Sequence, residues 1–288
     1  MNLFSFLRSE HLAVDWSYDA GGMVWRLMFA DRGRVIGECR DREKKLASFF
    51  CLDEETGKPL WRGMALEEPW WVGIEAVLND TVLLHTYASP DMPEHRGIRA
   101  FDVETGALRW RKDDVVYWFG SGEKVCAYRD FFEKRVGYEL DVRTGEVVTV
   151  HEESLQKLHD FRAEAGDPQA VPNLTVPEIL ADGTSDESVR ALVGRVANKK
   201  NIVGSIEFIL KNDILVFNYH VRSQNNGGER PALDNHLCVY RFPKGDRLFD
   251  EVIARNLVAA VPDSFFIRKS RLFFIKEQRT LTALRLWK

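Results

Sequence analysis

The chain lacks the features that mark a membrane, nucleic-acid or nucleotide-binding protein. No run approaches the roughly 18 apolar residues of a membrane helix, and the N-terminus has neither the basic nor the apolar region of a signal peptide. The 40 lysines and arginines are outnumbered by 44 aspartates and glutamates, so no basic excess favours nucleic acid. Neither Gly-x-x-x-x-Gly-Lys nor Gly-x-Gly-x-x-Gly occurs. We therefore expect no membrane and no nucleic-acid partner.

Cysteine is also scarce. The four cysteines are scattered and form no Cys-x-x-Cys pair; they are Cys39, Cys51, Cys126 and Cys238. Isolated thiols of this kind are typical of a reducing compartment, so we expect a cytoplasmic protein. The 288 residues, 45% of them hydrophobic, are enough for one large all-β domain or for two smaller domains.

What the sequence does have is one short motif in three copies. Each copy is an apolar residue, then Asp-x-x-Thr-Gly, then a strand-like run. The Asp carboxylate can accept hydrogen bonds from backbone N–H groups two or three residues on, Thr can do so more weakly, and Gly accepts the positive φ of a tight turn. The motif therefore predicts three structural turns, made by Asp53, Thr56 and Gly57, by Asp102, Thr105 and Gly106, and by Asp141, Thr144 and Gly145.

The spacing of the motif indicates a repeat. A Trp follows the Gly by four residues in the first two copies, Trp61 and Trp110, and Thr149 stands there in the third. The Asp positions are 49 and then 39 residues apart, which is the length of a propeller blade. Over residues 45–150 the motif resembles the repeat of the quinoprotein-like propellers, where Asp-x-x-Thr-Gly-x-x-x-Trp closes a blade between its third and fourth strands. The chain looks like one of the functionally uncharacterised bacterial families of that type.

The strand pattern predicts an all-β fold, a single five-bladed β-propeller over residues 1–288 with four-stranded antiparallel blades. Three blades precede residue 152, and a fourth begins at residue 202. The last region, 264–287, offers only three strands, so we expect the N-terminal strand 11–19, with Trp16, to complete that blade and close the ring. Six blades are the main alternative.

Residues 152–200 interrupt the blade pattern as a helical insertion between the third and fourth blades. Residues 152–164 predict one helix, and Val189, Leu192, Val193 and Val196 have the spacing of the apolar face of a second. An apolar helix face must be buried, so this stripe predicts either a plug for the propeller mouth or a surface for self-association. We expect a monomer.

The long connections predict a binding face. In four-stranded blades the inter-blade connections and the loops between the second and third strands lie at one end, opposite the Thr-Gly turns. The insertion 152–200 and the long loops 88–96 and 222–233 belong to this end. Binding residues usually lie on elaborated loops, although long loops also arise by tolerated drift. We expect a non-catalytic binding or scaffolding protein for a protein partner or a small molecule, and the candidate contact residues are Asp91, His95, Arg96, Arg222, Asn225, Asp234 and His236.

The alternative function is that of a glycoside hydrolase. Asp19, Glu68 and Asp114 each lie just before a predicted inner strand, so all three can point into the propeller mouth. Two carboxylates at a suitable separation are sufficient for glycoside cleavage. Acidic residues that only cap the inter-blade turns explain the same pattern more simply.

Cofactor and metal signals are weak. The resemblance by itself suggests a quinone, but no two cysteines are adjacent and the chain is too short for eight blades. We therefore predict no cofactor. His85 and His220 lie late in predicted second strands and are the candidate metal ligands, yet no two histidines have the short spacing of a metal site. Half-buried histidines without a metal are the simpler interpretation.

Overall fold

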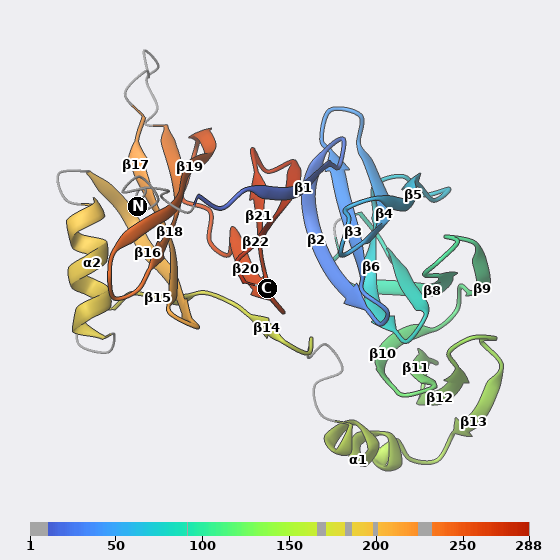
Figure 1. Cartoon of the computed structure of the whole chain (residues 1–288). Coiled ribbons are helices and arrows are strands. Elements are labelled where there is room, and N and C mark those ends of the chain that lie inside the picture. Colours follow the sequence, from blue (N-terminus) through green and yellow to red (C-terminus); the bar gives the residue numbers. More distant parts are fainter. Residues whose placement is uncertain are drawn as a thin grey trace, which may run out of the picture. The chain divides into compact units, whose positions relative to one another are not determined.

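The computed structural model describes residues 11–90, 92–165, 171–181, 186–197, 201–223 and 232–287. These residues form five antiparallel sheets of four or five strands and two short helices (Figure 1). The chain divides into two compact units. Unit 1 combines Met1–Asp19 with Asn173–Lys288, and unit 2 is Ala20–Pro172. The all-β prediction is confirmed.

Unit 2 consists of three four-stranded sheets, each a meander of consecutive strands. Sheet I is β2-β3-β4-β5, sheet II is β6-β7-β8-β9 and sheet III is β10-β11-β12-β13. The strands are β2 (Met23–Ala30), β3 (Arg34–Asp41), β4 (Leu46–Asp53), β5 (Pro59–Met64), β6 (Val72–Leu78), β7 (Thr81–Tyr87), β8 (His95–Asp102), β9 (Leu108–Lys112), β10 (Val116–Ser121), β11 (Lys124–Asp130), β12 (Arg135–Asp141) and β13 (Val147–His151).

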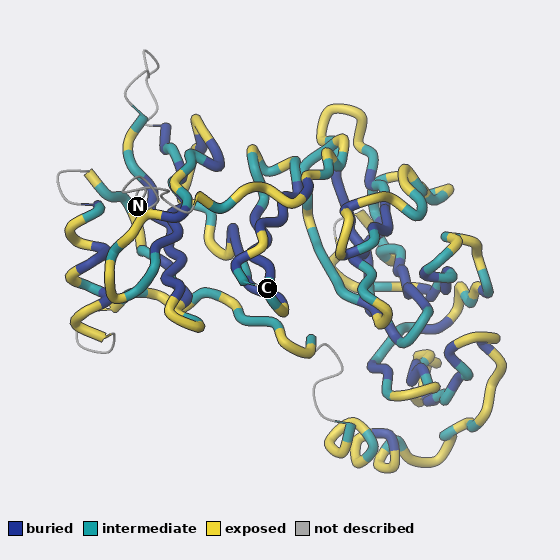
Figure 2. Tube along the Cα trace, in the orientation of Figure 1, coloured by how far each residue is buried: buried dark blue, intermediate teal, exposed yellow. Residues whose placement is uncertain are grey.

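Sheet II packs on both of its faces. Alternate residues of a strand point to opposite faces, so Leu84 joins an apolar cluster with Phe49 of sheet I. Its neighbour Leu83 joins a second cluster with Val125 and Leu140 of sheet III. Figure 2 shows these buried positions as dark blue segments within the strands. Burial on two faces gives sheet II near-continuous apolar strands rather than a simple polar and apolar alternation.

The two ends of the unit 2 sheets differ. We call the end that carries the Thr-Gly turns and the tight hairpins after β2, β6 and β10 the turn end. The opposite end, with the connections 42–45, 88–94 and 131–134, is the loop end.

Unit 1 consists of two five-stranded sheets. Sheet IV is β15-β16-β17-β18-β19 and sheet V is β1-β22-β21-β20-β14. Their strands are β1 (Val14–Asp19), β14 (Leu174–Thr175), β15 (Glu178–Ile179), β16 (Ile202–Lys211), β17 (Ile214–Arg222), β18 (Leu233–Arg241), β19 (Asp246–Leu257), β20 (Phe265–Arg268), β21 (Arg271–Lys276) and β22 (Thr280–Arg285). Val216 of sheet IV and Phe274 of sheet V belong to one buried cluster.

The N-terminal strand completes the last sheet, as predicted. β1 runs antiparallel to β22, from Val14 opposite Leu284 to Asp19 opposite Thr280. Trp16 is buried there, with its ring edge-on to Phe273 at a centroid distance of 5.8 Å.

The insertion does not have the predicted position at the loop end. Helix α1 (Gln156–Glu164) buries Leu158 in a cluster with Phe119 and Cys126, and therefore covers a face of sheet III. Helix α2 (Glu187–Ala197) buries its stripe, including Val189 and Leu192, on Phe217 and other residues of sheet IV. A stripe that is already buried on its own sheet is not available for self-association.

The segment between the two helices also forms strand pairs that the sequence does not predict. Its two-residue strands β14 and β15 extend sheets V and IV at their edges, through Leu174 opposite Arg268 and Glu178 opposite Phe208. No helix among the described residues is long and apolar enough to cross a membrane.

Candidate functional site

The three Thr-Gly turns have the predicted hydrogen bonds. In the first turn, Asp53 Oδ1 accepts from the Thr56 backbone N–H at 3.0 Å and from its hydroxyl at 2.8 Å. Asp102 with Thr105 and Asp141 with Thr144 repeat this pattern. The glycines that follow have φ of 67°, 69° and 71°; they are Gly57, Gly106 and Gly145.

In the two motifs that have a Trp, this residue reaches the turn of the next sheet. Trp61 Nε1 donates to the Val103 carbonyl at 2.8 Å, and Trp110 Nε1 donates to the Val142 carbonyl at 2.9 Å. A Cβ added to Gly145 would lie 2.5 Å from the Trp110 ring. The motif therefore joins sheet I to sheet II and sheet II to sheet III, and its residues are structural.

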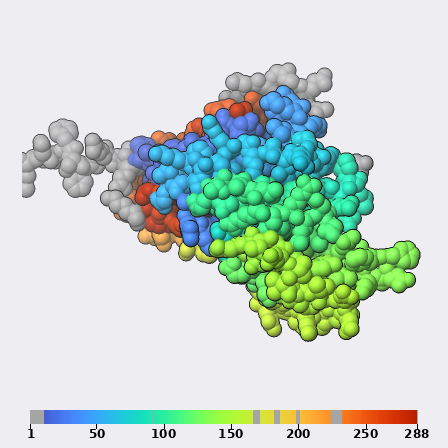
Figure 3. All heavy atoms as spheres, turned by 90° about the vertical axis from the view of Figure 1, so that its right-hand side faces the viewer, coloured from blue at the N-terminus to red at the C-terminus, as the bar shows by residue number. Residues whose placement is uncertain are grey.

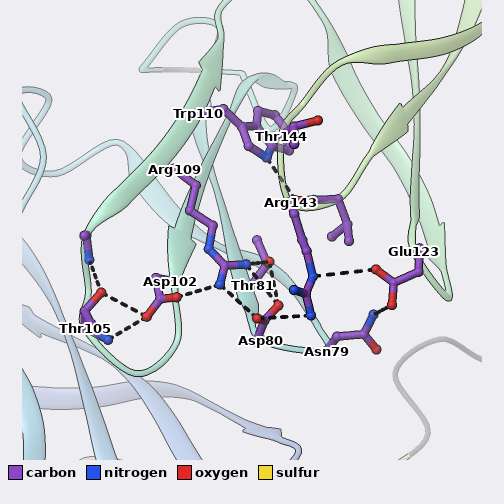
Figure 4. A network of polar contacts seen from close by, with 12 residues as sticks. Asn79, Asp80, Thr81, Asp102, Thr105, Arg109, Trp110, Glu123, Arg143 and Thr144 are labelled. Carbon is purple, nitrogen blue, oxygen red and sulfur yellow. Dashed lines mark hydrogen bonds and ion pairs between the residues drawn. The ribbon is translucent and has the colours of Figure 1, made fainter.

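A pocket of about 210 Å³ lies at the turn end, beside the polar network in Figure 4. Arg109 donates to Asp80 and to Asp102, and Arg143 approaches Asp80 at 3.4 Å and Glu123 at 3.8 Å. The hydrogen bonds from Arg109 lower the pKa of Asp80 to about 2. The lining residues Asp80, Glu123 and Arg143 are paired within this network, which stabilises the turns.

Three side chains meet at the loop end of sheet II, one from each of three adjacent strands. They are Glu75 of β6, His85 of β7 and His95, the first residue of β8. Glu75 Oε2 lies 2.9 Å from Nδ1 of His85 and 2.8 Å from Nδ1 of His95. The imidazole rings are parallel to within 9°, with centroids 3.5 Å apart. Among the described residues, this is the only group of three potential metal ligands.

Irregular strand pairing brings the three side chains together. Ile74 pairs with Leu84 and Ala76 pairs with Leu83, so Glu75 is the extra residue of a β-bulge. Such a bulge redirects a side chain that regular alternation would place elsewhere. A second irregularity, opposite His85, involves Gly97 at φ 72°.

Burial strongly affects this cluster. His85 is only 3% exposed, and neither of its ring nitrogens makes a hydrogen bond of good geometry, although Nδ1 is close to Glu75. Burial lowers the pKa of His85 and favours its neutral form. Burial alone would raise the pKa of Glu75, but the two imidazoles outweigh it and lower that pKa to about 2. The cluster therefore presents an ionised carboxylate beside a neutral, buried imidazole at neutral pH.

The other histidine candidates have different surroundings. His220 is 2% exposed, and its Nε2 accepts the Val261 N–H at 3.2 Å. His236 stacks on Tyr219 with a centroid distance of 5.0 Å. Among the described residues neither one belongs to a group of three potential ligands.

The three candidate catalytic acids each have a structural partner. Asp19 pairs with Arg279 at 2.6 Å and Asp114 pairs with Arg129 at 2.6 Å. Glu68 Oε1 accepts two backbone N–H bonds of 3.0 Å, from the residues at 70 and 71. Glu68 thus caps a turn, whereas Asp19 and Asp114 form ion pairs, and a catalytic role of the three acids stays a prediction.

The candidate binding residues are spread over both units. Arg96 is exposed and its Nε donates to the Asp113 carbonyl at 3.4 Å, while Arg222 is exposed at the end of β17. Asp234 Oδ1 accepts the Asn256 N–H at 3.2 Å. Asp91 and Asn225 lie outside the described residues.

Two exposed aromatic residues at the loop end were not predicted from the sequence as binding residues. Phe131 and Phe132, between β11 and β12, have exposed fractions of 45% and 104%. The Arg129 guanidinium lies 4.9 Å from the centroid of the Phe131 ring. Figure 3 shows the outside of unit 2, coloured from blue through green. Only the adjacent Phe-Phe pair in a polar stretch, DFFEK, signals this feature in the sequence.

Comparison with known proteins gives a family of unknown function. The model of the family "Domain of unknown function (DUF4905)" matches residues 30–110, from the end of β2 into β9. No curated protein matches the chain.

Several solved structures are similar over most of the chain. An uncharacterised protein from Listeria monocytogenes EGD-e is 11% identical, with 90% of this chain and 93% of that chain covered and a TM-score of 0.31. The β-propeller domain of the Trilobed protease from Pyrococcus furiosus is 8% identical, with 94% and 71% covered and a TM-score of 0.32. The Dos1 propeller is 10% identical, with 91% and 68% covered and a TM-score of 0.29. At these scores the likeness carries no functional argument.

Proposed function

We propose that this chain is a five-bladed β-propeller that binds a protein partner at its loop end and has no catalytic activity of its own. Five antiparallel sheets in sequence order, with the first strand paired in the last sheet, support the propeller. Within each unit, sheets that are consecutive along the chain also share apolar clusters.

One observation carries the binding role, the exposed Phe131 and Phe132 on the short loop between β11 and β12. Contiguous exposed apolar groups, rather than single ones, mark interaction sites, and these two rings are adjacent in sequence. Met92, in the long connection between β7 and β8, is 52% exposed at the same end. The proposed contact surface therefore consists of the connections 88–96 and 131–134 of unit 2.

The helices do not belong to this surface. Their apolar faces are buried on sheets III and IV, so deleting residues 152–200 would expose two sheet faces and would damage the fold. Point substitutions in the loops are the sharper test of binding.

The test compares Phe131→Ser/Phe132→Ser with Val148→Ser. Val148 is a matched control because it is also exposed, at 57%, but lies on β13. We expect wild type and Val148→Ser to capture the same protein from host lysate. Once purified, that protein should bind the double variant at least about tenfold more weakly than it binds wild type. Equal affinity of the purified partner for all three proteins would contradict the proposal.

The glycoside-hydrolase alternative has no comparable support. Two of the three acids, Asp19 and Asp114, form ion pairs with arginines. The third, Glu68, accepts a backbone hydrogen bond in a turn. Glycoside cleavage that is lost in Asp19→Asn, Glu68→Gln or Asp114→Asn would nevertheless replace the binding proposal with the enzymatic one.

A further inference from the structure

We propose that Glu75, His85 and His95 form a binding site for a divalent transition-metal ion, with Zn²⁺ the best match. This inference does not depend on the proposed binding of a protein partner. It rests on three side chains of one sheet within unit 2.

The ligand atoms are close to the geometry that an ion requires. One atom from each residue lies within 4.8 Å of the others. Zinc bonds of about 2.0–2.2 Å in a tetrahedral site place ligand atoms roughly 3.4 Å apart. Glu75 Oε2 lies 2.9 and 2.8 Å from the two Nδ1 atoms, so the three groups must separate slightly and one ring must tilt to admit an ion.

His85 provides an independent observation, because it is 97% buried with both ring nitrogens lacking a well-formed hydrogen bond. Buried polar groups normally have partners. A metal ion would provide one for Nδ1.

The surroundings hold the ligands in place. The three residues come from paired strands rather than from a loop, and the Tyr87 ring is edge-on to both imidazoles at 5.2 and 5.3 Å. The rings now lie parallel, whereas an ion must lie near the plane of each ring that binds it. Binding therefore tilts one ring, and His95 is the freer of the two because its side chain is 33% exposed.

The ligand set indicates the type of ion. Two imidazoles and one carboxylate suit zinc and similar first-row metals rather than calcium or magnesium, which prefer oxygen ligands. Three protein ligands leave a fourth position for water or for a group of a bound molecule. Cys51 and Cys126 do not compete well, since burial raises the pKa of both thiols to about 12 and disfavours their thiolates.

The test is titration of the tag-free full chain with Zn²⁺ after treatment with a chelator, measured by calorimetry. We expect one ion per chain, and at least about 100-fold weaker binding in Glu75→Gln and in His95→Ala. Glu139→Gln is the matched control, because Glu139 contacts His151 at 2.8 Å but has no second imidazole. Its affinity for Zn²⁺ should equal that of wild type.

Folding of each variant is checked by circular dichroism, and Co²⁺ replaces Zn²⁺ to report the ligands. A visible spectrum typical of four-coordinate nitrogen and oxygen ligands supports the proposal. Three results would overturn it: thiolate-to-cobalt charge-transfer bands, no binding below about 10 µM Zn²⁺, or equal affinity in wild type and folded Glu75→Gln.

Discussion

Gly145→Ala should destabilise unit 2 strongly, because two separate costs meet at one residue. Gly145 has φ of 71°, a conformation that costs a residue with a Cβ about 1–2 kcal/mol. The added Cβ would also lie 2.5 Å from Trp110. That indole is buried and is held by its bond to the Val142 carbonyl, so it cannot easily move away. Overpacking of this kind costs about 1–3 kcal/mol, and the two costs together reduce the free energy of unfolding by about 2–5 kcal/mol.

Two other glycines of unit 2 separate these costs. Gly122 has φ of 56° and no atom within 4 Å of the added Cβ, so Gly122→Ala carries only the backbone cost, about 1–2 kcal/mol. Gly106 has φ of 69° and Trp61 at 3.0 Å, a contact that a small shift can relieve. The expected order of destabilisation is Gly122→Ala, then Gly106→Ala, then Gly145→Ala.

The assay is urea unfolding followed by circular dichroism, which does not depend on the fluorescence of the tryptophans involved. In a Trp110→Ala background, the effect of Gly145→Ala should fall to that of Gly122→Ala, because the steric cost is removed. If Gly145→Ala is no more destabilising than Gly122→Ala in the wild-type background, the argument that Trp110 fixes this turn is refuted.

Two further predictions concern the packing of the insertion and the polar network. Leu192→Ala should lower the free energy of unfolding by about 2–5 kcal/mol, because Leu192 is only 4% exposed where it packs on sheet IV. The elution volume of this variant in size-exclusion chromatography should equal that of wild type. A shift would indicate that the stripe mediates self-association. Asp80 has a lower pKa in the folded chain, about 2, than the usual 3.9 of an unfolded chain. Its contribution, about 1–2 kcal/mol after solvent screening, is therefore present above pH 4 and lost as the pH falls toward 2. Melting temperatures of wild type and Asp80→Asn should converge over that interval, and a gap that persists at pH 2 would contradict the assigned role of the charge.

Local chemistry made much of the fold predictable. An Asp-x-x-Thr-Gly turn is determined within five residues, so all three turns and their flanking strands could be located. β1 (Val14–Asp19) lies within the predicted N-terminal strand 11–19. The pairing of β1 with the last sheet was predictable because three strands alone left that sheet incomplete.

The failures concern contacts between distant segments. Periodicity shows that α2 has an apolar face but not what covers it. The stripe predicted either a plug for the propeller mouth or self-association, whereas it packs on sheet IV. The two-residue strands β14 and β15 have no pattern of their own, since they exist only through backbone bonds to β20 and β16.

The candidate metal site was found only in part, for a similar reason. His85 was a candidate ligand and His95 a candidate binding residue, but their stacking depends on the register between β7 and β8. Glu75 was missed because a β-bulge directs its side chain, and no residue type signals a bulge there. The nearly equal spacing of Glu75, His85 and His95, ten residues each, was the one available hint.

The pairing of β1 with β22 sets an order for folding during synthesis. All strands of unit 2 lie between residues 20 and 172, so its sheets can form while the rest of the chain is still on the ribosome. Sheet V is different, because Val14 pairs with Leu284, and its first strand must remain unpaired with β22 until residue 284 has been made. Contacts so distant in sequence form slowly, and an unpaired strand edge is prone to aggregation. Formation of sheet V, rather than of the first three sheets, is therefore the stage at which this protein depends most on protection of β1.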